Sequence, residues 1–316
     1  MVKEQGIGTS HAKIILMGEH SVVYGQPAIA LPLPSVKLTV TMTPTHQGQT
    51  VDSRYFSGDW HALPPVMQGV RKLIAALVDH FNGQDDPWKM QIDSQLPAER
   101  GMGSSAATAV AIVRAFFDYY EQPLGRPELL ALADVEEQIT HRSPSGLDAA
   151  TVSSKTPLYY VKGHAGTAIP MNLQATMVIA DTGVKGATKE AIMAVQDLLA
   201  HDHDRAQEHI DHLGRLVVAS RTFLAQDEVF KLGTTLNAAQ QDLRALQVSD
   251  DQLDHLIDVA IENGALGAKL TGGGRGGCMF AITRTALGAR RLSGILKDNG
   301  ARQTWIQPLD TSRGED

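Results

Sequence analysis

Short apolar runs bounded by glycine, proline or polar residues predict strands in the first half of the chain. They cover residues 13–18, 28–33, 36–42, 88–92 and 158–161. The run 36–42 alternates, with apolar residues at Val36, Leu38 and Val40, which is typical of a strand with one buried face. We therefore expect an antiparallel or mixed sheet at the start of the chain.

Apolar residues spaced three or four positions apart predict amphipathic helices. The clearest is 64–81, one face of which carries Val66, Val70, Leu73, Ile74, Leu77, Val78 and Phe81. Further helices are expected after residue 104 and at 127–138, 186–200, 206–224 and 253–262. Strands at 177–180, 279–283 and 304–306 alternate with the later helices, as in a split β-α-β layer.

The composition of residues 163–172 is typical of a loop and divides the chain. With 316 residues, of which 43% are hydrophobic, there is enough material for two separate cores. We expect an α+β protein with one domain at 1–172 and a second at 173–316, the last strand packing back toward the first domain.

Charge and cysteine content narrow the class of partner. A net charge of -7 without a run of basic residues argues against a nucleic-acid surface as the main function. Cys278 is the single cysteine, so no intramolecular disulfide forms and a reducing compartment is indicated. No stretch has the length of a membrane span or the pattern of a leader peptide. We expect a cytoplasmic protein that acts on a small molecule, with no nucleic-acid or membrane partner.

The segment Arg100-Gly-Met-Gly-Ser-Ser-Ala-Ala107 leads from two glycines into a helix of small residues. Glycine lets backbone N–H groups approach an anion, and a helix N-terminus attracts negative charge. Ser104 and Ser105 would supply a helix cap and hydroxyl ligands. The segment therefore predicts a phosphate-binding loop.

Other interpretations of this loop stay open. It is not a Walker A motif, because no Gly-Lys-Ser/Thr follows at the required spacing. The pattern Gly-x-Gly-x-x-Ala106 also fits a dinucleotide turn, although Pro97 and polar residues separate the glycines from the preceding strand. An ordinary tight turn followed by a helix cap is the third interpretation.

Two carboxylates could share a site with the loop. Glu137 ends a predicted helix, and Asp148 follows on a Pro-Ser-Gly turn that can bend the chain back. With Ser105 they would offer the oxygen ligands that Mg²⁺ prefers. Lys13, next to a carboxylate, would keep it ionised and could hold a phosphate oxygen. Alternatively, each of these residues is a solvated or capping side chain.

A second glycine cluster and a histidine cluster are also candidates for function. Five glycines at 272–277 predict a close backbone approach to a ligand or to the first loop, in preference to a flexible hairpin, and Arg275 among them could reach a phosphate or solvent. His201, His203, His209 and His212 stand among acidic residues. A solvated helix face explains the histidines better than a metal site, because no compact ligand set is present.

Four segments in order resemble the motifs of the GHMP kinases. They are Lys13-Ile-Ile-Leu-Met-Gly-Glu-His-Ser-Val-Val-Tyr-Gly25, Gly101-Met-Gly-Ser-Ser-Ala-Ala107, Pro144-Ser-Gly-Leu-Asp148 and Lys269-Leu-Thr-Gly-Gly-Gly274. The resemblance covers essentially the whole chain. It implies a first domain similar to the second domain of ribosomal protein S5, a ferredoxin-like second domain, and phosphoryl transfer from ATP with Mg²⁺. The Gly-Glu-His segment favours members of the family that phosphorylate the 5-hydroxyl of mevalonate, on the route to isoprenoids.

The resemblance also implies a role for each matching residue. Asp148 would be the catalytic base and Lys13 its electrostatic partner, while Ser105 and Glu137 would hold Mg²⁺. Substrate contacts would come from Glu19 and His20, with His20 donating to the mevalonate carboxylate, and also from Lys13 and Asp148. The ATP phosphates would be bound by Gly101, Met102, Gly103, Ser104, Ser105 and Ala106.

The chain departs from the family pattern at two places. Ser10-His-Ala precedes Lys13 where Pro-Gly is frequent, and Arg275 interrupts the last glycine run. A kinase of phosphomevalonate or homoserine, or a non-catalytic metabolite sensor, is the alternative. A homodimer is compatible with the resemblance.

Overall fold

The computed structural model describes residues 2–140 and 146–309 and forms two compact units. Unit 1 comprises Met1–Ala12, Val36–Ala98 and Gly103–Ser154, and unit 2 comprises Lys13–Ser35, Glu99–Met102 and Lys155–Asp316. No helix within the described residues is both long and apolar enough to cross a membrane.

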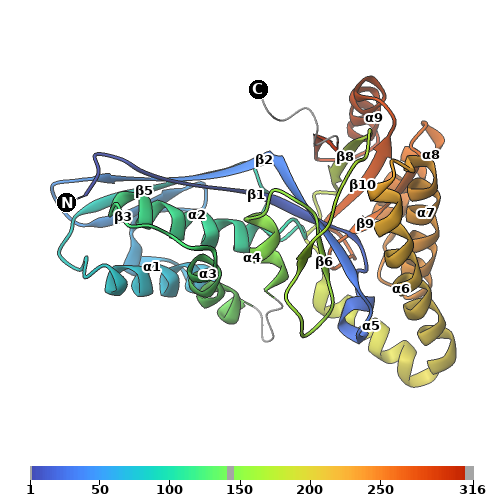
Figure 1. Ribbon diagram of the computed structural model, residues 1–316, viewed down its shortest axis with the longest axis horizontal. Helices are drawn as coiled ribbons and strands as arrows, with labels where there is room; N and C mark the ends of the chain where they lie inside the picture. Colours follow the sequence, from blue (N-terminus) through green and yellow to red (C-terminus); the bar gives the residue numbers. More distant parts are fainter. Residues whose placement is uncertain (1, 141–145, 310–316) are drawn as a thin grey trace. The chain divides into compact units, whose positions relative to one another are not determined.

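The strands of unit 1 form a mixed sheet (Figure 1). They are β3 (Gln49–Ser53), β4 (Phe56–Asp59), β5 (Trp88–Ser94) and parts of β1 (Gly6–Met17) and β2 (Ala28–Pro44). The order is β4-β3-β5-β2, with β1 beside β2, and β3 runs parallel to β5 while the other registered pairs are antiparallel. The mixed sheet predicted from the apolar runs is confirmed.

In the described part of unit 1 the α-helices are α1 (Gln68–His80), α2 (Ser104–Tyr119), α3 (Arg126–Thr140) and α4 (Leu147–Val152). Helices α1, α2 and α3 lie on one side of the strands (Figure 1). Eleven of the sixteen residues of α2 are buried, most of them alanine, valine or phenylalanine. The end of α2 joins an aromatic cluster with Phe81 and Trp88, in which the rings of Phe81 and Tyr120 stack 4.6 Å apart.

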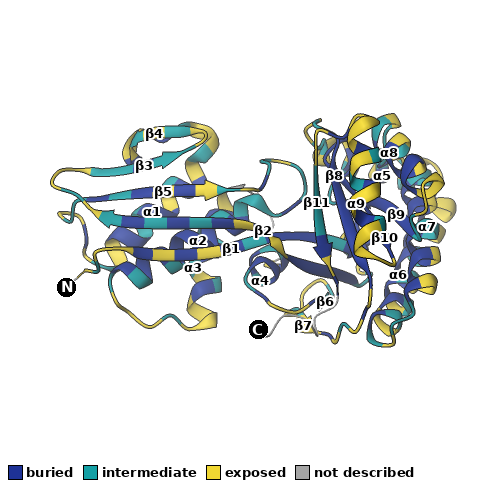
Figure 2. Ribbon diagram, turned by 90° about the horizontal axis from the view of Figure 1, so that it is seen from above, coloured by how far each residue is buried: buried dark blue, intermediate teal, exposed yellow. Residues whose placement is uncertain are grey.

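Unit 2 contains a four-stranded antiparallel sheet in the order β11-β8-β10-β9. Its strands are β8 (Thr176–Asp181), β9 (Gly267–Thr271), β10 (Cys278–Thr283) and β11 (Gln303–Pro308). Every residue of β8, β9 and β10 is buried (Figure 2). This strand order, with helices after the first and third strands, is ferredoxin-like.

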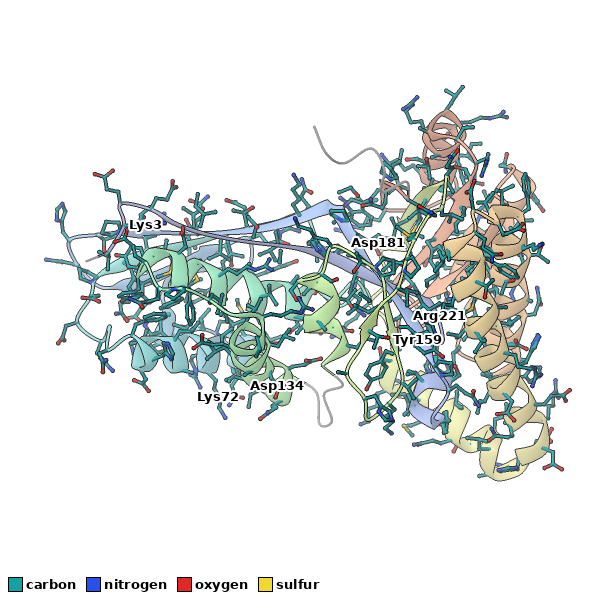
Figure 3. All side chains as sticks on the ribbon, in the orientation of Figure 1. Lys3, Lys72, Asp134, Tyr159, Asp181 and Arg221 are labelled. Atoms are coloured by element: carbon teal, nitrogen blue, oxygen red, sulfur yellow. The ribbon has the colours of Figure 1, made fainter. Side chains whose placement is uncertain are left out.

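The helices of unit 2 are α5 (Thr188–His201), α6 (His203–Ala225), α7 (Val229–Ala245), α8 (Asp251–Glu262) and α9 (Ala286–Asp298). Unit 2 also contains the short strands β6 (Leu158–Tyr160) and β7 (Thr167–Ala168), and β6 pairs with the beginning of β2. The guanidinium of Arg221 on α6 lies 5.1 Å from the ring centre of Tyr159 on β6 (Figure 3).

Most expected elements are present, and some additional ones were not predicted. The runs 28–33 and 36–42 belong to a single strand, β2, and helices α7 and α9 and strands β3, β4 and β9 are additional. For α7 the signal existed, because buried Val229, Leu232, Leu236 and Leu243 have helical spacing. Strand β9 was hidden by its lysine, since fully buried lysines are rare.

The two units do not follow a single cut after residue 172. Lys13–Ser35 groups with the C-terminal half, because two long strands, β1 and β2, carry the chain from one unit into the other. The last strand, β11, pairs with β8, and the Gln307 side chain also accepts a hydrogen bond from the Ser35 N–H at 3.0 Å. A boundary between independently folding domains at residue 172 stays a prediction.

Candidate active site

The first glycine loop has the backbone that its sequence requires. Gly101 and Gly103 adopt φ of 80° and 73°, in the left-handed region that favours glycine. Helix α2 begins at Ser104, so Gly103, and neither serine, is the N-cap residue, and it makes no side-chain cap hydrogen bond. The predicted serine cap is therefore wrong, because both serines lie within the first helical turn.

The Ser105 hydroxyl donates a hydrogen bond to another side chain of unit 1. Its Oγ donates a hydrogen bond of 2.5 Å to Oε1 of Glu136 on α3. A hydroxyl that donates its single proton in one direction keeps its lone pairs for an acceptor role elsewhere. The Ser105 oxygen can therefore still accept a hydrogen bond or bind a cation, and its role as a metal ligand stays a prediction.

Glu136 was not identified from the sequence. Its carboxylate packs against Gly69 of α1, where an added Cβ would lie 2.7 Å from Oε1. Glu136 and Glu137 are both buried, with 4% and 5% of their surfaces exposed. The signal available in the sequence was the pair of adjacent glutamates, but only the packing of α1 against α3 explains which of them orients Ser105.

The donor set is compatible with Mg²⁺. Hydroxyl and carboxylate oxygens are hard ligands, and Mg²⁺ often takes only one or two protein oxygens, completing its shell with phosphate and water. The described residues contain no group of three or more His, Cys, Asp or Glu side chains placed to hold a metal ion. A cation that also binds ATP phosphates does not need one.

Asp148 lies on a helix, whereas the sequence had suggested a turn. It occupies the first turn of α4, after Gly146 with φ of 67°, and its side chain is half-buried. The predicted turn falls partly on residues 141–145, outside the described residues. Leucine, alanine and valine at 147–152 pack into unit 1 and favour the helix.

Lys13 lies in β1 and is buried, with 5% of its surface exposed. Its backbone N–H donates to the carbonyl of Met102 at 3.0 Å, which attaches the strand to the first glycine loop. Lys13 belongs to unit 2 and Asp148 to unit 1, so their pairing stays a prediction.

Glu19 has a protein partner that the sequence did not suggest. Its Oε1 accepts a hydrogen bond from Nζ of Lys269, and neither side chain is exposed to solvent. Burial raises the pKa of Glu19 and lowers the pKa of Lys269, and their mutual attraction opposes both shifts. A direct contact of Glu19 with substrate stays a prediction.

His20 is buried and neutral. Burial lowers its pKa to about 4, and the positive charge of Lys269 adds to this shift. Nε2 lies 2.9 Å from the carbonyl of Gly273, which can only accept, so Nε2 carries the proton. Nδ1 is then an acceptor. This differs from the expected donor to a carboxylate, because the one N–H of the neutral ring is already engaged.

The second glycine run approaches the first loop closely. A Cβ on Gly272 would lie 2.9 Å from Cα of Gly101. The close approach predicted for the run is confirmed toward the first loop. Arg275 donates from Nε to the carbonyl of Gln247 at 3.0 Å, so part of its guanidinium is engaged within unit 2.

Arg100, which precedes the first loop, is also fixed. Its Nε donates to Oδ1 of Asp181 at 3.0 Å and its Nη2 donates to the carbonyl of Gly183 at 3.0 Å (Asp181 is labelled in Figure 3). The end of β8 is thereby connected to the start of the loop.

The clustered histidines join two helices. His209 and His212 of α6 place Nδ1 at 2.9 and 2.8 Å from the two oxygens of the buried Asp242 carboxylate on α7. His201 and His203 are exposed. The predicted solvated face therefore holds for two of the four, while the other two stabilise packing.

Two family models and several known proteins match this chain. The family model for the GHMP kinases N terminal domain matches residues 68–155, and the model for the GHMP kinases C terminal domain matches residues 229–302. The curated mevalonate kinase of Thermococcus sibiricus is 32% identical over 300 residues, covering 87% of this chain and 88% of that protein.

Two solved structures are similar along nearly the whole chain. The mevalonate kinase of methicillin-resistant Staphylococcus aureus MRSA252 is 32% identical, with a TM-score of 0.78, covering 98% of this chain and 100% of that chain. The L. major mevalonate kinase in complex with R-mevalonate is 26% identical, with a TM-score of 0.84, covering 98% of this chain and 99% of that one.

Proposed function

The chain belongs to the GHMP kinase family, and from this premise we propose that it is a mevalonate kinase. It would transfer the γ-phosphate of ATP to the 5-hydroxyl of (R)-mevalonate and give 5-phosphomevalonate. The observation that carries the proposal is the 32% identity to a curated mevalonate kinase over 87% of this chain. The R-mevalonate bound by the similar L. major enzyme supports the choice of substrate.

The reaction assigns a task to each named residue. The 5-hydroxyl oxygen of mevalonate bonds to the γ-phosphorus while the bond to the leaving ADP oxygen breaks, and the hydroxyl proton passes to Asp148. Lys13, the electrostatic partner that the family pattern implies, would neutralise charge on the phosphoryl group. The loop Gly101–Ala106 positions the phosphates through its N–H groups and the start of α2.

Ser105 and Glu137 would hold Mg²⁺, with Glu136 orienting the Ser105 hydroxyl from behind. The cation, when bound with ATP, neutralises phosphate charge. The hydrogen bond of 2.5 Å from Ser105 to Glu136 supports this division of roles. Glu136 then acts as the outer-shell partner that fixes a ligand's orientation.

His20 would accept a hydrogen bond from a hydroxyl of mevalonate through Nδ1. Its neutral ring, with Nε2–H donated to Gly273, supports an acceptor role in place of the donor role expected from the resemblance. Recognition of the carboxylate would then fall to other groups of the site.

A panel of acceptor alcohols tests the function. We expect ADP release with mevalonate to exceed release with phosphomevalonate, homoserine and galactose, measured in a coupled assay on the purified chain. Faster turnover of phosphomevalonate would overturn the proposal in favour of a sister kinase. Tight binding of ATP and mevalonate without ADP release would indicate a sensor.

Asp148→Asn provides the matched variant for this assay. Asparagine keeps the shape of the side chain and removes the proton acceptor, so kcat should fall by about 10²–10⁴ while mevalonate binding is retained. An unchanged kcat would remove Asp148 from the mechanism.

A further inference from the structure

Lys269 is wholly buried in the middle of β9 and makes three contacts through its ammonium group. Nζ donates to Oε1 of Glu19 and, at 2.7 Å, to the carbonyl of Leu270. It also lies 5.4 Å from the ring centre of Phe280, the residue opposite on β10. The Lys269 ammonium group is therefore held in place both by the sheet and by the segment that follows β1.

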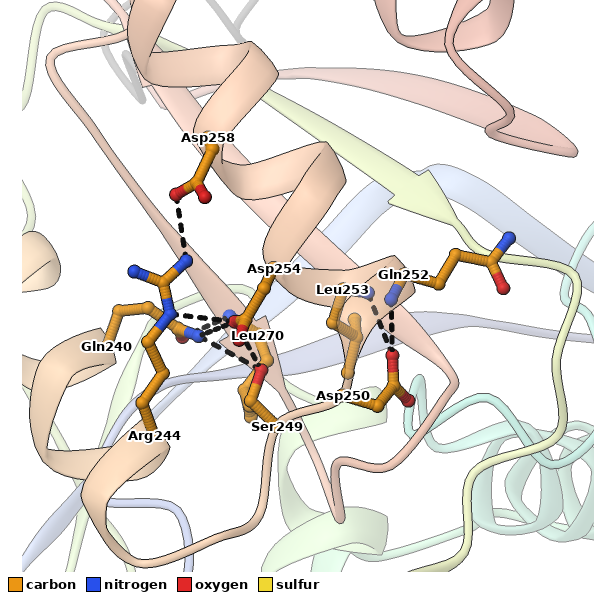
Figure 4. A network of polar contacts seen from close by, with 9 residues as sticks. All are labelled: Gln240, Arg244, Ser249, Asp250, Gln252, Leu253, Asp254, Asp258 and Leu270. Carbon is orange, nitrogen blue, oxygen red and sulfur yellow. Dashed lines mark hydrogen bonds and ion pairs between the residues drawn. The ribbon is translucent and has the colours of Figure 1, made fainter.

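Strand β9 is held on its outer edge by side chains of α7. The N–H groups of Ala268 and Leu270 donate at 3.0 Å to the side-chain oxygens of Asn237 and Gln240. Gln240 in turn donates to Ser249 and Asp254, in a network that continues to Arg244 (Figure 4). Since β9 is an edge strand, these bonds replace a missing neighbour and fix the position of Lys269.

The pair of Glu19 and Lys269 is not arranged for greatest stability. Removing two charges from water is costly, and an apolar pair of equal size often stabilises a protein interior as well as an ion pair does. In addition, Oε2 of Glu19 is buried and makes no hydrogen bond within the described residues. An acceptor left unsatisfied in the interior is unfavourable. A role other than stability would explain why charges occupy these two positions.

The pair lies between the two segments that place His20. Glu19 precedes His20, whose Nε2 donates to Gly273, and Lys269 precedes the Gly272–Gly277 loop that contains this acceptor. Thr271, between Lys269 and the loop, exchanges two hydrogen bonds of 3.0 Å with the backbone of Ile15. The ion pair therefore closes a short ring of contacts around His20.

We propose that Lys269, acting through Glu19, is a positioning residue that holds His20 and the Gly272–Gly277 loop in place for the phosphoacceptor. This inference rests on the proposed function for its chemical meaning. It assigns neither Lys269 nor Glu19 a direct contact with the reacting atoms. Loss of the pair should therefore affect the use of the acceptor more than that of ATP.

The decisive variant removes both charges together. A single Lys269→Met or Glu19→Gln change leaves one buried group without its partner and risks unfolding the chain. The double variant Glu19→Gln/Lys269→Met keeps the volume and avoids this. Asp242→Asn is the matched control, because it alters another buried carboxylate of unit 2 that contacts neither glycine loop in the bonds described above.

Two readouts are needed, kinetics and hydrogen exchange by mass spectrometry. We expect the double variant to fold, to raise KM for mevalonate at least tenfold with KM for ATP changed less than threefold, and to exchange the amides of 272–277 at least tenfold faster. Asp242→Asn should leave both readouts near the parent's. Parental exchange and KM in the double variant would overturn the proposal, and so would faster exchange with unchanged KM.

A failure of the proposed function gives a different pattern. If the parent chain does not phosphorylate mevalonate, the proposed substrate is wrong whatever the variants do. The exchange measurement, which needs no substrate, then decides the positioning role alone: faster exchange limited to 19–21 and 272–277 supports it, and parental exchange contradicts it.

Discussion

At the scale of single residues, one hydrogen bond from the Ser105 hydroxyl distinguishes two neighbouring glutamates. Ser105 donates to Glu136, and this leaves its lone pairs available to a cation that Glu137 would help to hold. The two carboxylates are consecutive on α3, so they point about 100° apart around the helix.

Substitution of each glutamate tests whether both carboxylates support cation binding. Glu137→Gln and Glu136→Gln should each raise the Mg²⁺ concentration for half-maximal rate about 10–100-fold, since a ligand and its orienting partner have comparable effects. The measurement is a Mg²⁺ titration of the kinase rate at saturating ATP. Glu128→Gln, at the exposed start of α3, is the control and should match the parent. A parental titration for Glu136→Gln would show that Ser105 needs no orienting partner.

His20 makes stability depend on pH. Its pKa in the folded chain is about 4, against an ordinary value of 6.5, so below pH 6.5 the unfolded chain binds a proton that the folded chain does not. Stability therefore falls as pH decreases from 6.5 to 4. Between pH 7 and pH 5 the parent should lose about 2 kcal/mol more free energy of unfolding than His20→Gln does.

Urea denaturation of both proteins at the two pH values measures this difference. Other titrating groups, such as His11, are common to both proteins and cancel. Equal losses in parent and variant would mean that His20 takes up a proton in the folded state at ordinary pH.

At the scale of elements, glycine is required where a loop meets backbone atoms. Gly274 has φ of 73°, and a Cβ there would lie 2.0 Å from the carbonyl oxygen of Val248. That oxygen also accepts the N–H of Arg275 at 3.0 Å, so it cannot move without losing this bond. The loop between β9 and β10 is thus fixed to the segment after α7.

Alanine substitution measures this fit. Gly274→Ala should lower the free energy of unfolding by at least about 2 kcal/mol more than Gly264→Ala does. Gly264 also has a positive φ, of 93°, but open space around its Cβ position, so the difference isolates the steric conflict from the backbone strain. Similar losses at both positions, in urea denaturation, would contradict the close approach.

At the scale of the whole molecule, the chain cannot be divided at one point without separating partners. The segment Lys13–Ser35 belongs to unit 2, where Ile15 bonds to Thr271 and Glu19 bonds to Lys269. A fragment of residues 173–316 keeps Thr271 and Lys269 but loses both partners.

The fragment 173–316 should therefore not unfold cooperatively. A buried lysine without its carboxylate partner is strongly destabilising, by about 3–5 kcal/mol. Circular dichroism during thermal unfolding should show a broad transition for the fragment and a sharp one for the full chain. A sharp transition of the fragment would support residue 172 as a boundary between independent domains.

The sequence by itself determined what depends on local spacing. The periodicities at 64–81 and 127–138 predicted α1 and α3, and the four ordered motifs indicated the family, because each pattern lies within a few residues of chain. The positive φ of Gly101 and Gly103 was also predictable, since few other residues adopt it.

Only the tertiary structure decided which distant groups meet. Glu136 for Ser105, Lys269 for Glu19 and Gly273 for His20 are 31, 250 and 253 residues away from their partners, and no spacing rule relates them. From the sequence alone a lysine is expected to be exposed to solvent. Lys269 is buried only because β9, α7 and the segment after β1 come together in the folded chain. Partner choice over such separations follows from packing, which local propensity does not encode.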